Sequence, residues 1–172
     1  MHPVEVEECL RSMVCICDSR EQPTPKLKAR LKQIGLPVER EALNVGDYSA
    51  KVMLPDGTWY KLPIGIERKM NITELCTCFC QERGRFRREF ERASESHTKM
   101  YLLIEDSTWE NIYTGRYRSR MAVKSLVASI LAWLARYNCQ IIMCKAETSG
   151  KLIRDILYYE GREILMGMVD DE

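Results

Sequence analysis

The stretch Ile66-Glu67-Arg68-Lys69 closes an apolar, strand-like run that begins at residue 58. A similar run occupies residues 48–54, and Asp56-Gly57 lies between the two runs. Asp-Gly between two strand-like runs is a strong signal for a β-hairpin. The two runs are therefore predicted to pair as antiparallel strands around this turn.

Asp47 opens the first strand of that hairpin and follows another strand-like run, residues 38–45. Strand pairing would bring Asp47 beside Glu67 at one end of the hairpin. Because side chains alternate along an extended segment, Glu67 and Lys69 leave the same face of their strand. The pattern predicts two carboxylates and a lysine that converge on one point.

Such a point suits metal-dependent cleavage of a phosphodiester. Two neighbouring carboxylates repel each other unless a cation lies between them. A hard ion such as Mg²⁺ takes oxygen ligands and keeps several waters, and a water on the ion can become nucleophilic. Lys69 would orient or deprotonate that water, or neutralise the developing charge. Taken singly, Gly46-Asp47 is an ordinary turn and Glu67-Arg68-Lys69 an ordinary charged surface run.

A further acidic motif, Asp18-Ser19-Arg20-Glu21, follows a short apolar strand predicted for residues 13–17. Ligands in α/β sheets often bind at the carboxyl ends of strands. Asp18 is a candidate for the metal site or for the groups around it, and Arg20 and Glu21 for a scissile phosphate and a ligand water. The alternative is a capped turn before the helix that Pro23 and Pro25 help to start.

Taken together, these motifs resemble the nuclease domain of the XPF-type structure-specific DNA endonucleases, within the PD-(D/E)xK fold. The resemblance runs from about residue 14 to about residue 161 and implies Mg²⁺ or Mn²⁺ held by Asp47, Glu67 and the Arg68 carbonyl. It also implies that Lys69 activates water, with Asp18, Arg20 and Glu21 in support. The matching motifs are Asp18-Ser19-Arg20-Glu21, Leu43-Asn44-Val45-Gly46-Asp47-Tyr48, Ile66-Glu67-Arg68-Lys69 and Gly84-Arg85-Phe86.

The chain departs from the family pattern at Thr73, where the family usually carries an aspartate, and Glu74 stands next to it. Either Glu74 substitutes from the adjacent position or that accessory role is lost. Family members prefer branched or flapped DNA and usually carry a tandem helix-hairpin-helix module, for which this chain has no room. Grip on the substrate is then expected from a partner, a dimer mate or basic clusters, and a small stand-alone form suits phage or mobile-element DNA processing.

The formal net charge is only +1, so any affinity for nucleic acid must come from local clusters. One candidate cluster comprises Arg85, Arg87 and Arg88 on a helix predicted for residues 71–92, which Gly84 would break locally. A second comprises Arg116, Arg118 and Lys124 near the start of a helix predicted for residues 121–137, where phosphates would offset the charge. Either cluster is equally compatible with an ordinary charged helix surface.

The sequence has eight cysteines and no signal peptide, which is typical of reduced thiols in a cytosol. Cys76, Cys78 and Cys80 fall within a predicted helix, where residues two apart point in opposing directions and cannot close on one ion. Buried thiols and no zinc are therefore expected, and the rival is a metal-thiolate interaction domain. No stretch is long and apolar enough to span a membrane.

A chain of 172 residues suffices for one domain with a sizeable core. Further strands are predicted at residues 99–105 and 140–144, and further helices between the Pro23 and Pro25 start and a stop at Gly35, and at residues 147–168. The pattern indicates an α/β fold with a mixed central sheet and helices on both faces. The resemblance adds a homodimer through the late helices, while the rival function is a non-catalytic DNA-binding or scaffolding partner of the same fold.

Overall fold

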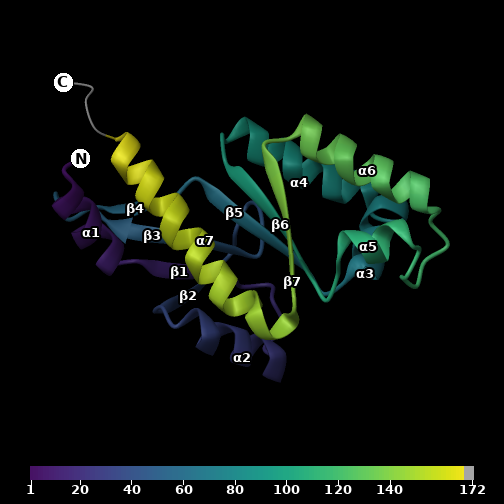
Figure 1. Cartoon of the computed structure of the whole chain (residues 1–172). Helices are drawn as coiled ribbons and strands as arrows, with labels where there is room; N and C mark the ends of the chain where they lie inside the picture. Colours follow the sequence, from purple (N-terminus) through teal and green to yellow (C-terminus); the bar gives the residue numbers. More distant parts are fainter. Residues whose placement is uncertain (169–172) are drawn as a thin grey trace. The chain divides into compact units, whose positions relative to one another are not determined.

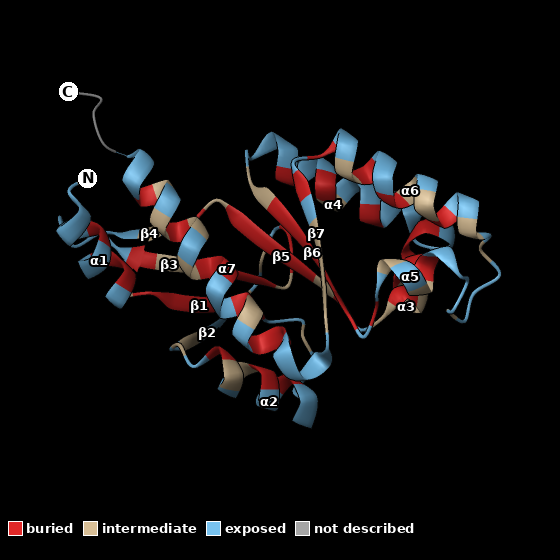
Figure 2. Cartoon of the chain, viewed as in Figure 1, coloured by how far each residue is buried: buried red, intermediate tan, exposed pale blue. Residues whose placement is uncertain are grey.

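The computed structural model describes residues 1–168 and shows a mixed sheet flanked by helices, as the sequence predicts (Figure 1). Strands β1, β5 and β6 are buried along most of their length, whereas the long helices are buried on one side (Figure 2). In chain order the elements are α1 (Pro3–Arg11), β1 (Val14–Asp18), α2 (Pro25–Ile34), β2 (Val38–Glu41), β3 (Tyr48–Met53), β4 (Trp59–Lys61), β5 (Ile64–Lys69), α3 (Ile72–Cys80), α4 (Arg83–Glu95), β6 (Lys99–Glu105), α5 (Trp109–Tyr113), α6 (Val123–Arg136), β7 (Cys139–Cys144) and α7 (Ala146–Gly167).

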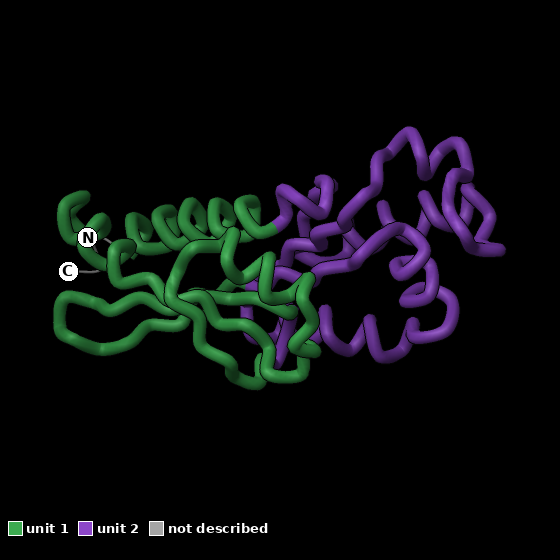
Figure 3. The backbone as a smooth tube through the Cα atoms, turned by 90° about the horizontal axis from the view of Figure 1, so that it is seen from below, with its two compact units in different colours: residues 1–43, 47–64, 150–172 green, residues 44–46, 65–149 purple. Residues whose placement is uncertain are grey.

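The chain forms two compact units (Figure 3). Unit 1 comprises residues 1–43, 47–64 and 150–172, and unit 2 comprises residues 44–46 and 65–149. The boundary at residues 44–47 separates the loop before Asp47 from Asp47 itself. Each unit is described separately below.

Unit 1 is built around β1, whose five residues are all buried. β1 pairs with β2 in parallel, with Cys15 opposite Val38, and with β3 in antiparallel fashion, with Cys17 opposite Tyr48. A strand buried on every residue reads as a continuous apolar run, which explains why residues 13–17 were recognisable from sequence. The polar end of this run, Asp18, is therefore fixed at the edge of a packed core.

The predicted hairpin forms, but its second strand is shorter than expected. β3 and β4 pair antiparallel, Gly57 has φ +83°, and the Leu54 amide donates to the Thr58 carbonyl over 2.8 Å. The single strand expected over residues 58–66 is wrong, because it is split into β4 and β5 at Leu62-Pro63. Proline has no amide hydrogen for the strand ladder. Within the hairpin, β3 is therefore followed by β4 rather than by the strand that carries Glu67.

The helices of unit 1 pack closely through glycines. α2 begins at its Thr24 cap and ends at Gly35, which has φ +64° as its predicted stop requires. A Cβ added at Gly150 of α7 would lie 2.5 Å from the Gln33 Cβ of α2, so this helix pair tolerates no side chain there. Arg30 of α2 is buried and donates to the Tyr48 hydroxyl over 3.0 Å.

Unit 2 contains β5, β6 and β7, with β6 and β7 parallel from Met100 opposite Cys139 to Glu105 opposite Cys144. Its core is largely aromatic: Phe86 of α4 stacks on Trp133 of α6 with ring centroids 5.1 Å apart. Phe79 of α3 meets both rings edge to face. Aromatic pairs of this geometry add to the stability gained from burial alone, so α3, α4 and α6 are firmly joined.

Two helices differ from expectation. The helix predicted over residues 71–92 is two helices, because α3 ends at Cys80 and α4 begins at Arg83, so the break precedes Gly84. Cys76 and Cys78 of α3 are buried and Cys80 is exposed, and burial raises the pKa of the Cys78 thiol to about 11. The sequence also gave no sign of α1, which starts with a capping box formed by His2 and Glu5.

Within residues 1–168, no helix combines the length and the apolar character that crossing a membrane requires.

Candidate active site

The last residues of β5 carry a buried ion pair. Glu67 and Lys69 leave the same face of the strand, as alternation predicts, and the Lys69 Nζ lies 2.5 Å from a Glu67 carboxylate oxygen. Their exposed fractions are only 6% and 8%. The Lys69 ammonium also lies 5.4 Å from the centroid of the Phe86 ring, which belongs to α4. The predicted acid and lysine are thus held side by side in a largely dry environment.

Arg68 points to the opposite face and makes a contact that the sequence did not predict. Its Nε and Nη2 donate to the two carboxylate oxygens of Glu105, each over 2.8 Å. Glu105 ends β6 and is 3% exposed. A lone acid at the end of a continuous apolar strand is the one sequence signal that could have drawn attention to it. This fork fixes the Arg68 side chain and thereby the main chain around it.

The loop before Asp47 is held by α4 and β5 of unit 2. The Gly46 amide donates to Glu89 over 2.8 Å, and the Arg92 Nε donates to the Asn44 carbonyl over 3.2 Å. Gly46 has φ +73°, and a Cβ there would lie 3.0 Å from the Ile66 nitrogen. Only glycine meets both conditions without strain. Glu89 and Arg92, which the sequence did not single out, are therefore anchors of this loop.

Asp18 and its neighbours form a separate arrangement in unit 1. The Asp18 amide donates to the Asp47 carbonyl over 2.8 Å, and Asp47 is half-buried. The buried Asp18 carboxylate accepts two bonds from the Arg20 Nε, at 3.0 and 3.1 Å, and a shorter one from Nη2. Burial acts to raise the pKa of Asp18, but the hydrogen bonds from Arg20 outweigh it and hold that pKa below its usual value.

Arg20 and Glu21 both make hydrogen bonds with other residues of the chain. The Arg20 Nη2 also donates to the Leu43 carbonyl over 2.8 Å. The Glu21 carbonyl accepts a bond of 2.5 Å from Arg40, a residue that the sequence did not single out. Asp18, Arg20 and Asp47 are brought together in unit 1, and Glu67 and Lys69 in unit 2. The convergence of Asp47 with Glu67 stays a prediction.

The predicted metal ligands are all oxygen donors, which is the set that Mg²⁺ and Mn²⁺ prefer. Among the described residues, no three His, Cys, Asp or Glu side chains gather closely enough to hold a metal ion. Mg²⁺ is commonly held by only one or two carboxylates and keeps several waters. The candidate set of Asp47, Glu67 and the Arg68 carbonyl, with two carboxylates, agrees with this type of coordination. A site made entirely of protein side chains is not found in residues 1–168.

Of the basic residues predicted to contact DNA, Arg20 lies in unit 1 and the others lie on the surface of unit 2. Arg85, Arg87 and Arg88 are exposed on α4, where Arg87 pairs with Glu91 over 3.4 Å. Arg116 and Arg118 are exposed in the loop after α5, and Lys124 is exposed near the start of α6. Solvated arginines of this kind suit contacts with phosphates. Their role stays a prediction.

Thr73, which stands where the family usually carries an aspartate, makes a contact of its own. The Thr73 hydroxyl accepts a bond of 3.1 Å from the Arg118 amide. The neighbouring Glu74 accepts from the Met70 amide over 2.7 Å, at the start of α3 that Asn71 caps. Thr73 therefore ties the loop after α5 to α3, and Glu74 is used at the helix start.

Residues 17–155 match the model of the ERCC4 domain. The chain belongs to the ERCC4-domain family. The matched span covers all the site residues predicted from the sequence, from Asp18 to Lys124. No curated protein matches the chain.

Two solved structures that resemble this ERCC4 domain are of XPF from Aeropyrum pernix. One has a TM-score of 0.61 and 21% sequence identity, and the match covers 90% of this chain and 68% of that one. The other, a complex with DNA, has a TM-score of 0.54 and 22% identity, and covers 92% of this chain and 68% of the other. At this level of identity, the likeness establishes the fold, which is the restriction-endonuclease-like fold predicted from the sequence.

Proposed function

We propose that this ERCC4 domain is a Mg²⁺- or Mn²⁺-dependent DNA endonuclease that hydrolyses phosphodiester bonds. The observation that carries the proposal is the buried pair of Glu67 and Lys69 at the end of β5. Two charged groups are costly to bury, and a pair that serves stability alone is often replaceable by apolar residues. A buried acid and lysine on one face of a strand end are better accounted for by chemistry on a phosphate.

Asp47 and Glu67 are the proposed metal ligands, together with the Arg68 carbonyl. Support for their approach comes from the turn of unit 2: Gly46 directly precedes Asp47, and its backbone packs against Ile66, which directly precedes Glu67. When bound, the metal ion would neutralise charge at the scissile phosphate and lower the pKa of a water.

The remaining residues have distinct proposed roles. The Lys69 ammonium, beside the Glu67 carboxylate, orients the attacking water or offsets charge that develops on the phosphate. Arg68, clamped on Glu105, keeps its own carbonyl in a fixed direction. Asp18 holds the Asp47 main chain through its amide while Arg20 occupies its carboxylate, so we assign Asp18 and Arg20 as positioning residues.

The proposed substrate is branched or flapped DNA, as the family resemblance implies. The exposed arginines of α4 and the residues Arg116, Arg118 and Lys124 would grip the backbone. A homodimer through α7 would add a second grip. Tyr159 of α7 is 62% exposed and open to such a partner, whereas the Tyr158 hydroxyl already donates to Glu7 over 3.2 Å.

The decisive experiment is a cleavage assay on flapped, forked and linear duplex DNA with the wild type, Glu67→Gln and Lys69→Met. We expect cleavage with Mg²⁺ or Mn²⁺ and none with EDTA. Because metal charge stabilisation supplies several kcal/mol and each 1.4 kcal/mol is tenfold, Glu67→Gln should lower the rate at least about a hundredfold. Both substitutions nearly preserve side-chain size, and thermal unfolding would verify that the variants fold.

Equal inactivity of the wild type and Glu67→Gln on every substrate and metal would sink the proposal. If such inert proteins still bound flapped DNA with equal affinity, the non-catalytic DNA-binding partner would be the correct description.

A further inference from the structure

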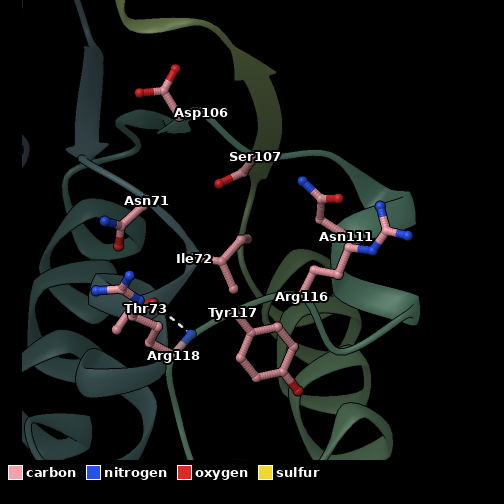
Figure 4. Close-up of a pocket in the computed structure, with 9 residues that line it drawn as sticks. All are labelled: Asn71, Ile72, Thr73, Asp106, Ser107, Asn111, Arg116, Tyr117 and Arg118. Atoms are coloured by element: carbon pink, nitrogen blue, oxygen red, sulfur yellow. Dashed lines mark hydrogen bonds between the residues drawn. The ribbon is translucent and has the colours of Figure 1, made fainter.

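A pocket of about 280 Å³ lies in unit 2, among the start of α3, the end of β6 and the loop after α5 (Figure 4). Asn71 and Thr73 line one side and Asn111 and Arg116 the other, with Ser107 between them and Arg118 in the loop after α5. Pockets for drug-sized ligands start at roughly 300 Å³. This pocket is therefore matched to a ligand fragment, such as a sugar and the phosphate attached to it.

Two arginines line this pocket. Arg116 and Arg118 are both exposed, and within residues 1–168 neither guanidinium has a hydrogen bond or an ion pair. Figure 4 shows the Arg116 guanidinium on the Asn111 side and the Arg118 guanidinium on the Asn71 side. The donors of both groups remain available to a ligand, at two separate places along the pocket.

The main chain that carries these arginines is nevertheless fixed. The Arg116 amide donates to the Asn111 carbonyl over 2.8 Å, and the Arg118 amide donates to the Thr73 hydroxyl over 3.1 Å. The Tyr117 hydroxyl donates to the Met121 carbonyl over 2.8 Å. A fixed loop that presents unpaired cations lowers the entropic cost of binding, because less of the site must be ordered by the ligand.

The charge balance of the pocket selects an anion. Asp106 is the one acid among the described residues that line it, and its carboxylate accepts a bond from the Ala146 amide over 3.1 Å. Thr73 is neutral, and its hydroxyl accepts the hydrogen bond from the Arg118 amide. The Glu74 carboxylate accepts from Met70. With two arginines against one engaged acid, the pocket favours a ligand that carries negative charge.

We propose that this pocket binds a short stretch of a single nucleic-acid strand, with one backbone phosphate at Arg116 and another at Arg118. The inference rests on the proposed function, since DNA supplies the phosphates. It adds to that function a defined place for an unpaired strand in unit 2. The chemistry recognised is the phosphate group, so a free phosphate or mononucleotide is the competing source.

The test is fluorescence anisotropy with a labelled (dT)8 strand, without divalent metal, over a range of NaCl concentrations. Arg116→Gln and Arg118→Gln should each weaken binding about tenfold, because each removes hydrogen bonds between charged groups. Each should also reduce the slope of log K against log [NaCl] by about 0.7, the value for one phosphate contact on a single strand. Arg120→Gln, exposed on the same loop but outside the pocket, is the matched control and should change affinity less than about twofold.

A second arm uses the wild type as the reference and does not depend on a variant's fold. A (dT)8 strand with uncharged methylphosphonates at its central linkages should bind the wild type more weakly but should bind the double variant as the unmodified strand does. Inorganic phosphate and dTMP should displace the labelled strand only at far higher concentrations than unlabelled (dT)8. If Arg120→Gln had the same effect as the pocket variants, or if either small anion displaced (dT)8 at equal concentration, the proposal would be overturned.

Failure here and failure of the proposed function give different results. Glu67→Gln should lose cleavage and keep (dT)8 binding, whereas the two pocket variants should lose (dT)8 binding. If the protein cleaves DNA but the pocket variants leave its (dT)8 affinity unchanged, only this inference is refuted.

Discussion

Two strand ends in this protein each hold a carboxylate with an arginine fork, and they do so in different ways. At the end of β1, Asp18 is clamped by Arg20, which is two residues away and 67% exposed at its side chain. At the end of β5, Arg68 reaches across to Glu105 of β6, and the two side chains are only 16% and 4% exposed. One fork is local and has a solvated arginine, and the other joins distant parts of the sequence with both side chains largely buried.

The difference shows which fork the fold depends on. Both carboxylates are buried, so the forks differ in their arginines, and the largely solvated Arg20 guanidinium gives a weaker, screened ion pair. A carboxylate that loses its partner inside the core is left as an uncompensated buried charge. We therefore expect the β5 fork to support the fold of unit 2 and the β1 fork to adjust the geometry around Asp47.

The largest effect is expected from breaking the buried fork. Arg68→Ala should lower the free energy of unfolding by about 3–5 kcal/mol, because Glu105 would remain buried without its partner. Urea unfolding followed by tryptophan fluorescence would measure this. The double variant Arg68→Met with Glu105→Leu removes both charges and should recover much of the loss; if it were as unstable as Arg68→Ala, the buried charge would not be the cause.

The next effect concerns the turn beside β5. Gly46→Ala should cost about 1–3 kcal/mol, because alanine is strained at a φ of +73° and its Cβ would crowd the Ile66 backbone. Gly57→Ala provides a comparison with the same sign of φ, +83°, but with open space around the Cβ. Gly46→Ala should be the more destabilising of the two in thermal unfolding. An equal loss would show that the close contact with Ile66 contributes nothing.

A smaller effect, dependent on pH, is expected at the pair of Asp18 and Arg20 at the end of β1. The pKa of Asp18 is lowered in the folded state, so its charged form stabilises the protein above the unfolded pKa of about 3.9. This contribution is lost as pH falls through the folded pKa. Asp18→Asn should therefore cost about 1 kcal/mol at pH 7, and the difference from the wild type should shrink below pH 4. A gap that stays constant between pH 7 and pH 3 would contradict the assignment.

The smallest effect is expected on α4. Arg87→Ala breaks an exposed pair with Glu91 and should change the free energy of unfolding by less than about 0.5 kcal/mol. Chemical denaturation measured beside Arg68→Ala sets the scale for the whole series. A loss comparable to that of Arg68→Ala would mean that exposure does not distinguish these ion pairs.

The sequence was sufficient for features that depend on local pattern. β1, which is buried at every residue, was recognised from its apolar run, and Gly57 indicated the hairpin turn. The alternation of side chains along a strand correctly placed Glu67 and Lys69 on one face. Each of these features depends on residues that are close in sequence, so composition and periodicity are enough to predict it. The family resemblance, which the match over residues 17–155 bears out, supplied the fold class.

Features that depend on distant partners were missed. Glu105 lies 37 positions from Arg68, and Arg30 lies 18 from Tyr48, so nothing in either local pattern announces the contact. Glu89 was not singled out from the sequence, yet its carboxylate accepts a hydrogen bond from the Gly46 amide. In each case a tertiary contact decides what the side chain does. A buried charge is tolerated only where a partner reaches it, and these partners are distant in sequence.

The bonds from Glu89 and Arg92 to the loop at residues 44–46 have a mechanical consequence. On α4 the exposed Arg85 lies about one turn before Glu89 and the exposed Arg88 about one turn before Arg92, and an α-helix moves as a stiff rod over such distances. A load applied to the outer face of this rod is transmitted to the chain just upstream of Asp47. A polyanion attached along α4 would therefore pull on residues 44–46, which directly precede Asp47.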